Sequence, residues 1–127
     1  MGNRAVITAS TAPDAPSIYL HWNGGRDSVE GFLKAARDLS IKGTSAESFD
    51  RFAHVLARYF FGCEVGHHVY RQEFSKADAD NWDNGTYVID SNFKIIDRLF
   101  QRHGEQYGHK SAAIAADITA RAPIFND

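Results

Sequence analysis

The stretch SIYLHWNGGRDSVEGFL, residues 17–33, decides how this chain folds. Its first part, Ser17–Trp22, is rich in β-branched and aromatic residues, which predicts a strand. An Asn-Gly-Gly turn at 23–25 interrupts that strand. Asp27 follows, and Glu30 stands three residues later, as in a capping box at the start of a helix. We therefore expect a strand, a glycine turn and a helix in immediate succession.

Two helices are predicted after the turn, because apolar residues recur there at the spacing of one helix face. They are Val29, Phe32, Leu33, Ala36 and Leu39 in the first helix, and Phe49, Phe52, Ala53, Leu56 and Phe60 in the second. Ser45 is the expected N-cap of the second helix, and Gly62 suits the residue just after its end. Each helix should pack its apolar face on a sheet.

The remaining strands are expected at Arg4–Thr8, Glu64–Tyr70, Gly85–Ile89 and Phe93–Leu99, with a hairpin turn between the last two. A further helix is expected over Lys110–Arg121. The order β-β-α-α-β-β-β-α predicts an α+β fold. It should hold an antiparallel β-sheet, two amphipathic helices packed on it, and an extra C-terminal helix.

The length of 127 residues suits one domain, with a core over residues 1–99 and a C-terminal extension, 100–127, for which oligomerisation is a reasonable role. The single cysteine, Cys63, excludes an intramolecular disulfide and is expected to be a buried thiol. The apolar run after Arg4 is too short for a signal peptide, and nothing approaches a membrane span. These features favour a cytosolic protein.

The net charge of −2 gives the chain no field that would attract a DNA or RNA duplex. Any phosphate must be held by a few arginines and backbone amides. The segment His21–Asp27 suits this task, because Gly24 and Gly25 allow a ligand to approach the backbone. A helix N-terminus and the cation of Arg26 lie next to them. The plainer interpretation is a strand-to-helix turn with an exposed arginine.

A second group of polar residues stands at Asn81, Asp83 and Arg98. In an extended chain Asn81 and Asp83 point to the same side, where an amide and a carboxylate can recognise ribose hydroxyls or a base edge. The alternative is a loop that enters a hairpin and carries a surface ion pair with Arg98. Asn84-Gly85 is ordinary turn chemistry in either case.

The sequence holds no convincing metal site or catalytic pair. His67-His68 follows Glu64, but this is not a helix-borne zinc motif, and neighbouring strand residues point apart. We expect His54 to face solvent. Glu30, Asp83 and His21 are the only acid–base groups near the proposed anion sites. We therefore expect a protein without cofactor or metal that is not an enzyme.

Three blocks resemble a small phage protein group found in bacterial viruses and prophages, which we identify with the first-described Thoeris anti-defence sponge family. The blocks are Met1–Ile7, Ser17–Leu33 and Asp80–Ile89, and the resemblance covers roughly Met1–Arg98. It implies a nucleotide-binding protein in the cytoplasm of the infected bacterial host. Such proteins sequester cyclic ADP-ribose isomers, such as glycocyclic ADP-ribose, without degrading them. Some members also bind CBASS cyclic trinucleotides, and they form homodimers or hexamers.

The resemblance also implies roles for particular residues. For an ADP-ribose isomer these are Asn81, Asp83 and Arg98, an aromatic stacking residue that is Phe74 or alternatively Tyr70, and a phosphate-binding arginine at Arg51. For a cyclic oligonucleotide they are His21, Gly24, Gly25 and Arg26. Two alternatives remain: a protein-binding inhibitor of a host defence protein, in which the Gly-Gly turn is only structural, and a nucleotide-signal hydrolase.

Overall fold

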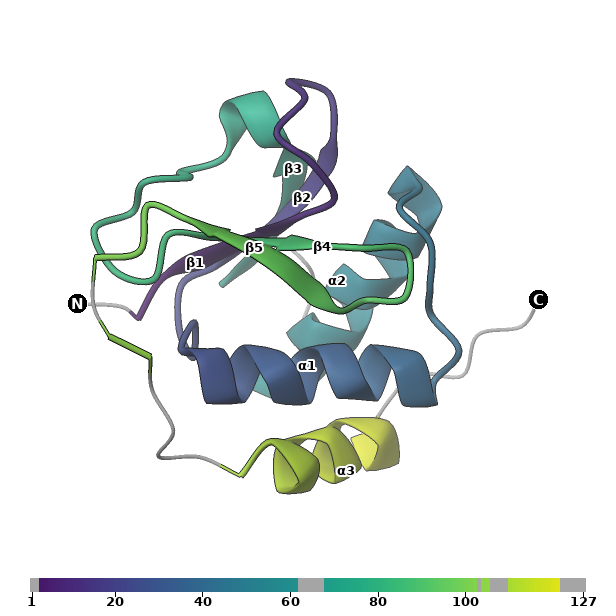
Figure 1. Cartoon of the computed structure of the whole chain (residues 1–127). Helices are drawn as coiled ribbons and strands as arrows, with labels where there is room; N and C mark the ends of the chain where they lie inside the picture. Colours follow the sequence, from purple (N-terminus) through teal and green to yellow (C-terminus); the bar gives the residue numbers. More distant parts are fainter. Residues whose placement is uncertain (1–2, 62–67, 103, 106–109, 122–127) are drawn as a thin grey trace.

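A five-stranded sheet with the strand order β3-β2-β1-β4-β5 is the frame of the protein (Figure 1). The computed structural model describes residues 3–61, 68–102, 104–105 and 110–121. The strands are β1 (Ala5–Thr8), β2 (Pro16–Leu20), β3 (Val69–Glu73), β4 (Thr86–Ile89) and β5 (Ile95–Leu99). β1 and β4 lie at the centre of the sheet and are buried along their whole length, β2 beside them is mostly buried, and the edge strands β3 and β5 are partly exposed.

The sheet is mixed, since β1 pairs with β4 in parallel and every other pair is antiparallel. The expected α+β class is confirmed, but the sheet is not fully antiparallel as expected, because it contains one parallel pair. Its cause is the direction of β3. β3 and β4 point the same way, so the connection between them must return along the length of the sheet. The short 3-10 helix η1 (Phe74–Lys76) and the irregular residues 77–85 form this return.

The helices α1 (Arg26–Asp38) and α2 (Ala46–Phe61) cover one face of the sheet, as expected. Their apolar residues meet alternate strand residues in one core, and the side chains of Phe32, Phe52 and Tyr87 within it are fully buried. α3 (Ser111–Arg121) packs on the outer side of α1 and forms a third layer (Figure 1). Gly31 of α1 permits this contact, because a Cβ there would lie 2.9 Å from Ile114.

The helix caps agree with the sequence at one helix and differ at the other. The Ser45 hydroxyl accepts a hydrogen bond from the Ser48 N–H at 3.1 Å, which confirms Ser45 as the N-cap of α2. The expected cap at Asp27 is wrong. Gly25 is the N-cap of α1, and its carbonyl accepts the first helical bond from Val29. The helix therefore begins before Asp27, whose carboxylate instead accepts a bond from the adjacent Ser28 N–H.

Several strand ends differ from the expected bounds. β2 ends at Leu20 rather than Trp22, and β3 continues to Glu73. The helix-end glycine Gly62, the thiol Cys63 and residues 64–67 lie outside the described residues. His54 is exposed, as expected. Within the described part of the chain, the helices are too short or too polar to cross a membrane.

Gly85 provides a test of the fold where the return segment enters β4. Its φ is +68°, and a Cβ there would lie 2.1 Å from the Leu99 carbonyl oxygen. Gly85→Ala should therefore lower the free energy of unfolding by at least about 3 kcal/mol, from backbone strain and overpacking together. Urea denaturation measures the change. Gly104→Ala is the control, because nothing lies within 4 Å of its Cβ position. Equal stability of the two variants would contradict the described turn.

Candidate functional site

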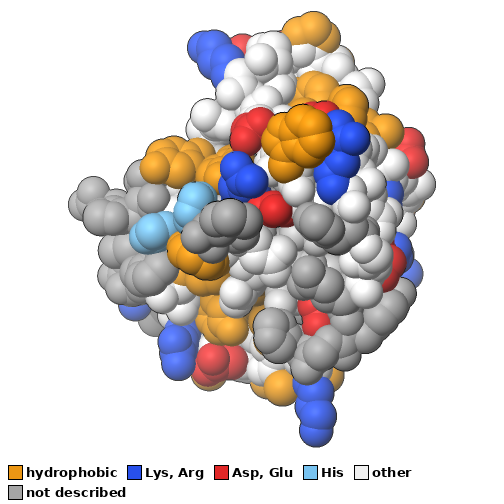
Figure 2. All heavy atoms as spheres, turned by 90° about the vertical axis from the view of Figure 1, so that its left-hand side faces the viewer, with side chains coloured by type: hydrophobic (Ala, Val, Ile, Leu, Met, Phe, Trp, Pro, Cys, Tyr) orange, Lys and Arg blue, Asp and Glu red, His pale blue; other side chains and the backbone are white. Residues whose placement is uncertain are grey.

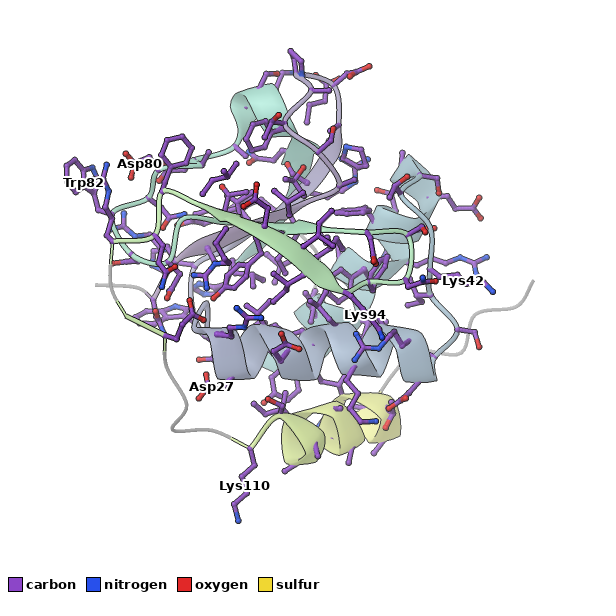
Figure 3. The ribbon with its side chains drawn as sticks, in the orientation of Figure 1. Asp27, Lys42, Asp80, Trp82, Lys94 and Lys110 are labelled. Carbon is purple, nitrogen blue, oxygen red and sulfur yellow. The ribbon has the colours of Figure 1, made fainter. Side chains whose placement is uncertain are left out.

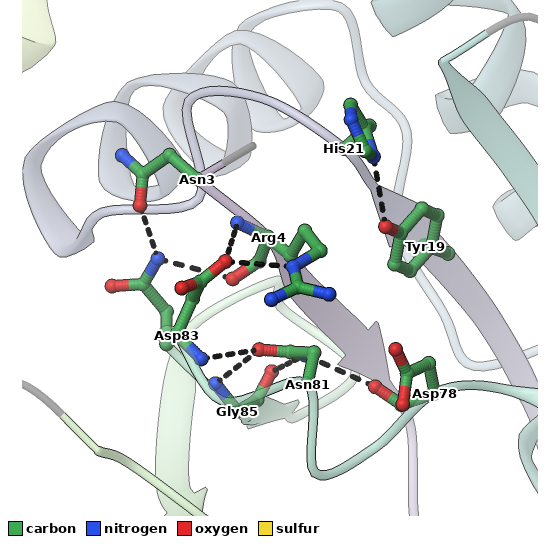
Figure 4. Close-up of polar contacts among 9 residues, drawn as sticks. Asn3, Arg4, Tyr19, His21, Asp78, Asn81, Asp83 and Gly85 are labelled. Carbon is green, nitrogen blue, oxygen red and sulfur yellow. Dashed lines mark hydrogen bonds and ion pairs between the residues drawn. The ribbon is translucent and has the colours of Figure 1, made fainter. Parts of the chain in front are cut away.

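The loop that leads into β4 is held together by the side chain of Asn81 (Figure 4). Its amide donates hydrogen bonds to the carbonyls of Asp78 and Gly85, both at 3.0 Å. Its oxygen accepts the N–H groups of Asp83 at 3.2 Å and Gly85 at 3.0 Å. Asn81 is fully buried. These contacts use both amide protons and both oxygen lone pairs, so the side chain is a structural clamp.

The loop is not extended at Trp82, where φ is +64°. The expectation that Asn81 and Asp83 present one common polar side is therefore wrong. Asn81 binds two N–H groups beyond Trp82, and this folds the chain into a tight turn. The indole is turned outward, with 67% of its surface exposed. The Arg102 guanidinium lies 4.5 Å from the indole ring centroid.

Asp83 is bound to Arg4 at the start of β1 (Figure 4). One carboxylate oxygen accepts the Arg4 backbone N–H at 3.0 Å and its Nε–H at 2.8 Å. The loop is thus fixed to the first strand. The alternative ion pair of Asp83 with Arg98 is not the one observed: Arg98 donates to the Asn84 carbonyl at 3.1 Å and pairs with Glu105.

The Gly-Gly turn packs tightly against the N-terminal segment. The Gly24 N–H donates to the Asn3 carbonyl at 2.8 Å, and a Cβ at Gly24 would lie 2.6 Å from that oxygen. The Gly24 carbonyl accepts a 2.7 Å hydrogen bond from the Tyr87 hydroxyl. Both glycines are buried. The close approach that requires Gly24 is therefore an approach of the protein's own backbone.

Two of the predicted anion-binding residues meet although they are distant in sequence. Arg26 at the start of α1 and Arg98 in β5 both face the carboxylate of Glu105. Arg98 Nη1 contacts one oxygen, and Arg26 Nε lies 3.7 Å from the other. The Arg98 guanidinium stacks 3.9 Å from the centroid of the Tyr87 ring. The two sites expected from the sequence thus share a carboxylate.

A cleft of about 240 Å³ opens over the edge of the sheet at β2 and β3, on the side that the return segment covers. It is lined by Tyr19, Tyr70, Gln72, Lys76 and Asp78. The two tyrosine rings lie 5.8 Å apart between centroids and are tilted by 44°. They are cross-strand partners, because Tyr19 pairs with Tyr70 in the register of β2 and β3. The cleft therefore combines aromatic faces with an amine, an amide and a carboxylate.

Arg4 and His21 extend the polar surroundings of this cleft. The Tyr19 hydroxyl and His21 Nδ1 are hydrogen-bonded at 3.0 Å. Arg4 lies between Asp83 and Tyr19 in Figure 4. Burial raises the pKa of Tyr19, and the positive charge of Arg4 opposes that rise. His21 also contacts the rings of Trp22 and His68, at 5.1 and 5.9 Å between centroids. Histidines and hydrophobic side chains lie together on the face shown in Figure 2.

Phe74 and Arg51 stand on different elements from the Asn81 loop, in η1 and α2 respectively. Phe74 begins η1 and is half-buried, whereas the alternative stacking residue, Tyr70, lines the cleft. Arg51 lines a polar pocket of about 200 Å³ with Lys42 at the start of α2. Lys42 and Trp82 lie on opposite sides of the molecule (Figure 3). Within one chain, Arg51 is therefore remote from the Asn81 loop.

Sequence reasoning missed Tyr19, Lys76, Asp78 and Glu105. The alternation of Tyr19 with His21, and of Tyr70 with Gln72, was a usable signal, because residues two apart on a strand share a face. No comparable local signal marks Glu105. The described residues contain no cluster of three or more His, Cys, Asp and Glu that would hold a metal ion. His67, His103 and His109 lie outside them.

Comparisons with protein-family models, with curated proteins and with solved structures gave no match to this chain.

Tyr87 links the Gly-Gly turn to the arginine cluster, and its ionisation gives a pH test. Burial raises the pKa of Tyr87 far above its usual value near 10, and the charges of Arg98 and Arg26 only partly offset the effect. The folded state therefore keeps the proton longer than the unfolded state, so stability is lost as the pH rises above 10. Because of this proton, the free energy of unfolding falls by about 1.4 kcal/mol for each pH unit above 10.

Tyr87→Phe should remove this part of the alkaline slope, measured by urea denaturation between pH 9 and pH 11.5. At pH 7 the variant should lose about 1–2 kcal/mol, because the buried Gly24 carbonyl loses its donor. An unchanged slope above pH 10 would contradict a buried, hydrogen-bonded hydroxyl at Tyr87.

Proposed function

We propose that this protein is a phage anti-defence sponge in the cytoplasm of the infected host. It binds and sequesters cyclic nucleotide immune signals without degrading them. The ligands are cyclic ADP-ribose isomers, with CBASS cyclic trinucleotides as a second class, and no cofactor takes part. The observation that carries the proposal is the cleft between Tyr19 and Tyr70, with Lys76 and Asp78 at its rim.

The chemistry of the cleft suits a nucleotide. Tilted aromatic rings offer faces on which a base can stack, and Lys76 is a flexible cation for a phosphate. The carboxylate of Asp78 and the amide of Gln72 are suitable partners for ribose hydroxyls or a base edge. Arg4 adds a second cation close to Tyr19, and Asp83 fixes its position.

The size of the cleft limits how much of the ligand it takes. Pockets for drug-sized molecules have volumes of roughly 300–1,000 Å³. At about 240 Å³, this cleft fits one nucleoside portion. The rest of a cyclic dinucleotide-sized ligand would extend past Lys76 or contact a second copy of the chain. Nanomolar capture requires about −12 kcal/mol, which is more than one stacked base and a few charged hydrogen bonds supply. Homo-oligomer formation therefore belongs to the proposal.

Asn81 takes a different part in this proposal from the one that the resemblance implies. All its hydrogen-bonding capacity is used within the loop. It acts by shaping the wall of the cleft and by holding Asp83 against Arg4. Direct contact with the ligand is assigned instead to Tyr70, the alternative stacking residue.

A protein-binding inhibitor is the second candidate, and the exposed side chain of Trp82 favours it. An indole that is 67% exposed and flanked by Arg102 is a common kind of anchor at protein interfaces. Hydrophobic, basic and acidic side chains lie side by side on the face shown in Figure 2. Asp80 pairs with Arg102 beside it, and the hydrogen bond from Arg102 lowers the pKa of Asp80.

The sponge proposal is tested by capture and release. The protein is incubated with cyclic ADP-ribose, with glycocyclic ADP-ribose or with a cyclic trinucleotide, filtered to remove free ligand and denatured by heat. Chromatography of the supernatant should recover intact ligand in stoichiometric amount. A linear product, or turnover of excess ligand, would instead indicate the hydrolase. Failure of every ligand to bind, with no rise in melting temperature, would favour the protein-binding inhibitor.

Tyr70→Ala tests the location of the site. Loss of one base-stacking contact should weaken the affinity of the captured ligand by roughly 5- to 150-fold, the equivalent of about 1–3 kcal/mol. Isothermal titration calorimetry measures the change. Trp82→Ala is the matched control, because it removes an exposed aromatic ring outside the cleft. Equal loss in both variants, or loss only in the Trp82 variant, would place the ligand elsewhere.

A further inference from the structure

We propose that Arg26 and Arg98 form a single phosphate-binding site, in which the carboxylate of Glu105 stands as a displaceable internal anion. The site lies at the start of α1, apart from the Tyr19–Tyr70 cleft. The inference goes beyond the proposed function, because it does not depend on which nucleotide the cleft takes. The ligand class is a phosphate or diphosphate group.

The first support is convergence. Arg26 comes from the first position of α1 and Arg98 from the middle of β5, yet both guanidinium groups face one carboxylate. Guanidinium groups bind carboxylates and phosphates with the same two-point geometry. A phosphate offers more acceptor oxygens and more charge than a carboxylate. Two arginines that share one Glu are thus better matched to a phosphate.

The second support is that the Arg98–Glu105 pair leaves buried polar atoms without hydrogen bonds. Arg98 Nε and Glu105 Oε2 are both buried and lack a hydrogen-bond partner among the described residues. The 3.7 Å separation of Arg26 Nε from Glu105 Oε2 is too long for a hydrogen bond. Buried polar atoms are almost always hydrogen-bonded in folded proteins. The Glu105 carboxylate therefore occupies the site but leaves part of its hydrogen-bonding capacity unused.

The third support is rigidity on the cationic side. The Arg98 side chain is only 12% exposed, stacks on Tyr87 and donates to the Asn84 carbonyl. Tyr87 in turn donates to Gly24. Arg98 is thus held in place by contacts that do not involve Glu105. Displacement of the carboxylate would leave a positioned guanidinium facing the ligand.

Other acidic groups near the site do not replace Glu105. Glu30 lies 3.4 Å from Arg26, but this is a partly exposed pair between residues four apart on one helix and contributes little. Asp27 is buried, and its carboxylate accepts the Ser28 N–H (Figure 3 labels Asp27 at the start of α1). Glu105 is the acid that contacts both arginines, with Gln101 donating to it at 2.7 Å.

The proposal predicts that Glu105→Gln, which keeps the shape and removes the charge, binds inorganic pyrophosphate about tenfold more tightly than the native protein. The factor corresponds to loss of one competing charged hydrogen bond. Calorimetry in phosphate-free buffer without divalent metal measures it. The double variant Glu105→Gln, Arg26→Gln should lose the gain. Asp117→Asn is the charge-matched control, because Asp117 is exposed in α3 and pairs with Arg121.

Three results would overturn the proposal: an affinity of Glu105→Gln equal to or below that of the native protein, the same gain in Asp117→Asn, or a gain that persists without Arg26. If Glu105→Gln does not fold by circular dichroism, Glu105→Asp replaces it. Its shorter side chain cannot reach both arginines, and a gain of a few-fold is expected. Capture of cyclic nucleotides with no pyrophosphate effect would refute this inference alone. The predicted pyrophosphate effect without capture of any cyclic nucleotide would refute only the sponge proposal.

Discussion

The hydrogen bonds of the Asn81 side chain are the constraint on which the rest of the structure depends. β3 and β4 run in the same direction, so the chain must return along the sheet between them. Residues 77–85 of this return segment form neither helix nor strand, so no regular ladder of hydrogen bonds satisfies their backbone groups. Asn81 supplies the missing partners, since one buried amide binds three residues of the segment. The parallel pairing of β1 with β4 rests on this loop.

The same loop determines which polar side chains are available to a ligand. By fixing Asp83 against Arg4, it holds a cation at the side of the Tyr19–Tyr70 cleft and keeps the Asp83 carboxylate occupied. By turning the backbone at Trp82, it directs an indole into solvent. The residues most suggestive in the sequence are therefore those that build the loop. The residues that line the cleft stand on β2, on β3 and in the return segment itself.

The sequence was sufficient to predict what periodicity and turn chemistry control. Five strands, two helices on the sheet and a third helix follow from local patterns, and Ser45 caps α2 as its neighbours predict. The cap at Asp27 was mispredicted because Gly25, with no side chain to signal it, already accepts the first helical bond. The parallel strand pair was missed because the direction of β4 depends on long-range pairing rather than on any local pattern.

The candidate site was predicted less well, and for the same physical reason. The sequence pattern groups Asn81, Asp83 and Arg98, but a polar side chain is available to a ligand only if its partners in the fold leave it free. The partners that decide this are distant in sequence: Arg4 for Asp83 and Glu105 for Arg98. Nothing local to either residue reveals its partner.

In this chain, whose net charge is −2, Arg4 and Arg98 each have an internal carboxylate close to them. What distinguishes the pairs is how completely the carboxylate is bound. Asp83 accepts two hydrogen bonds from Arg4 and completes a structural joint. Glu105 leaves one buried oxygen without a donor and faces two cations. A carboxylate that completes the hydrogen bonding around an arginine stabilises the fold. A carboxylate that leaves part of this hydrogen bonding unmade is the group that a better anion can replace.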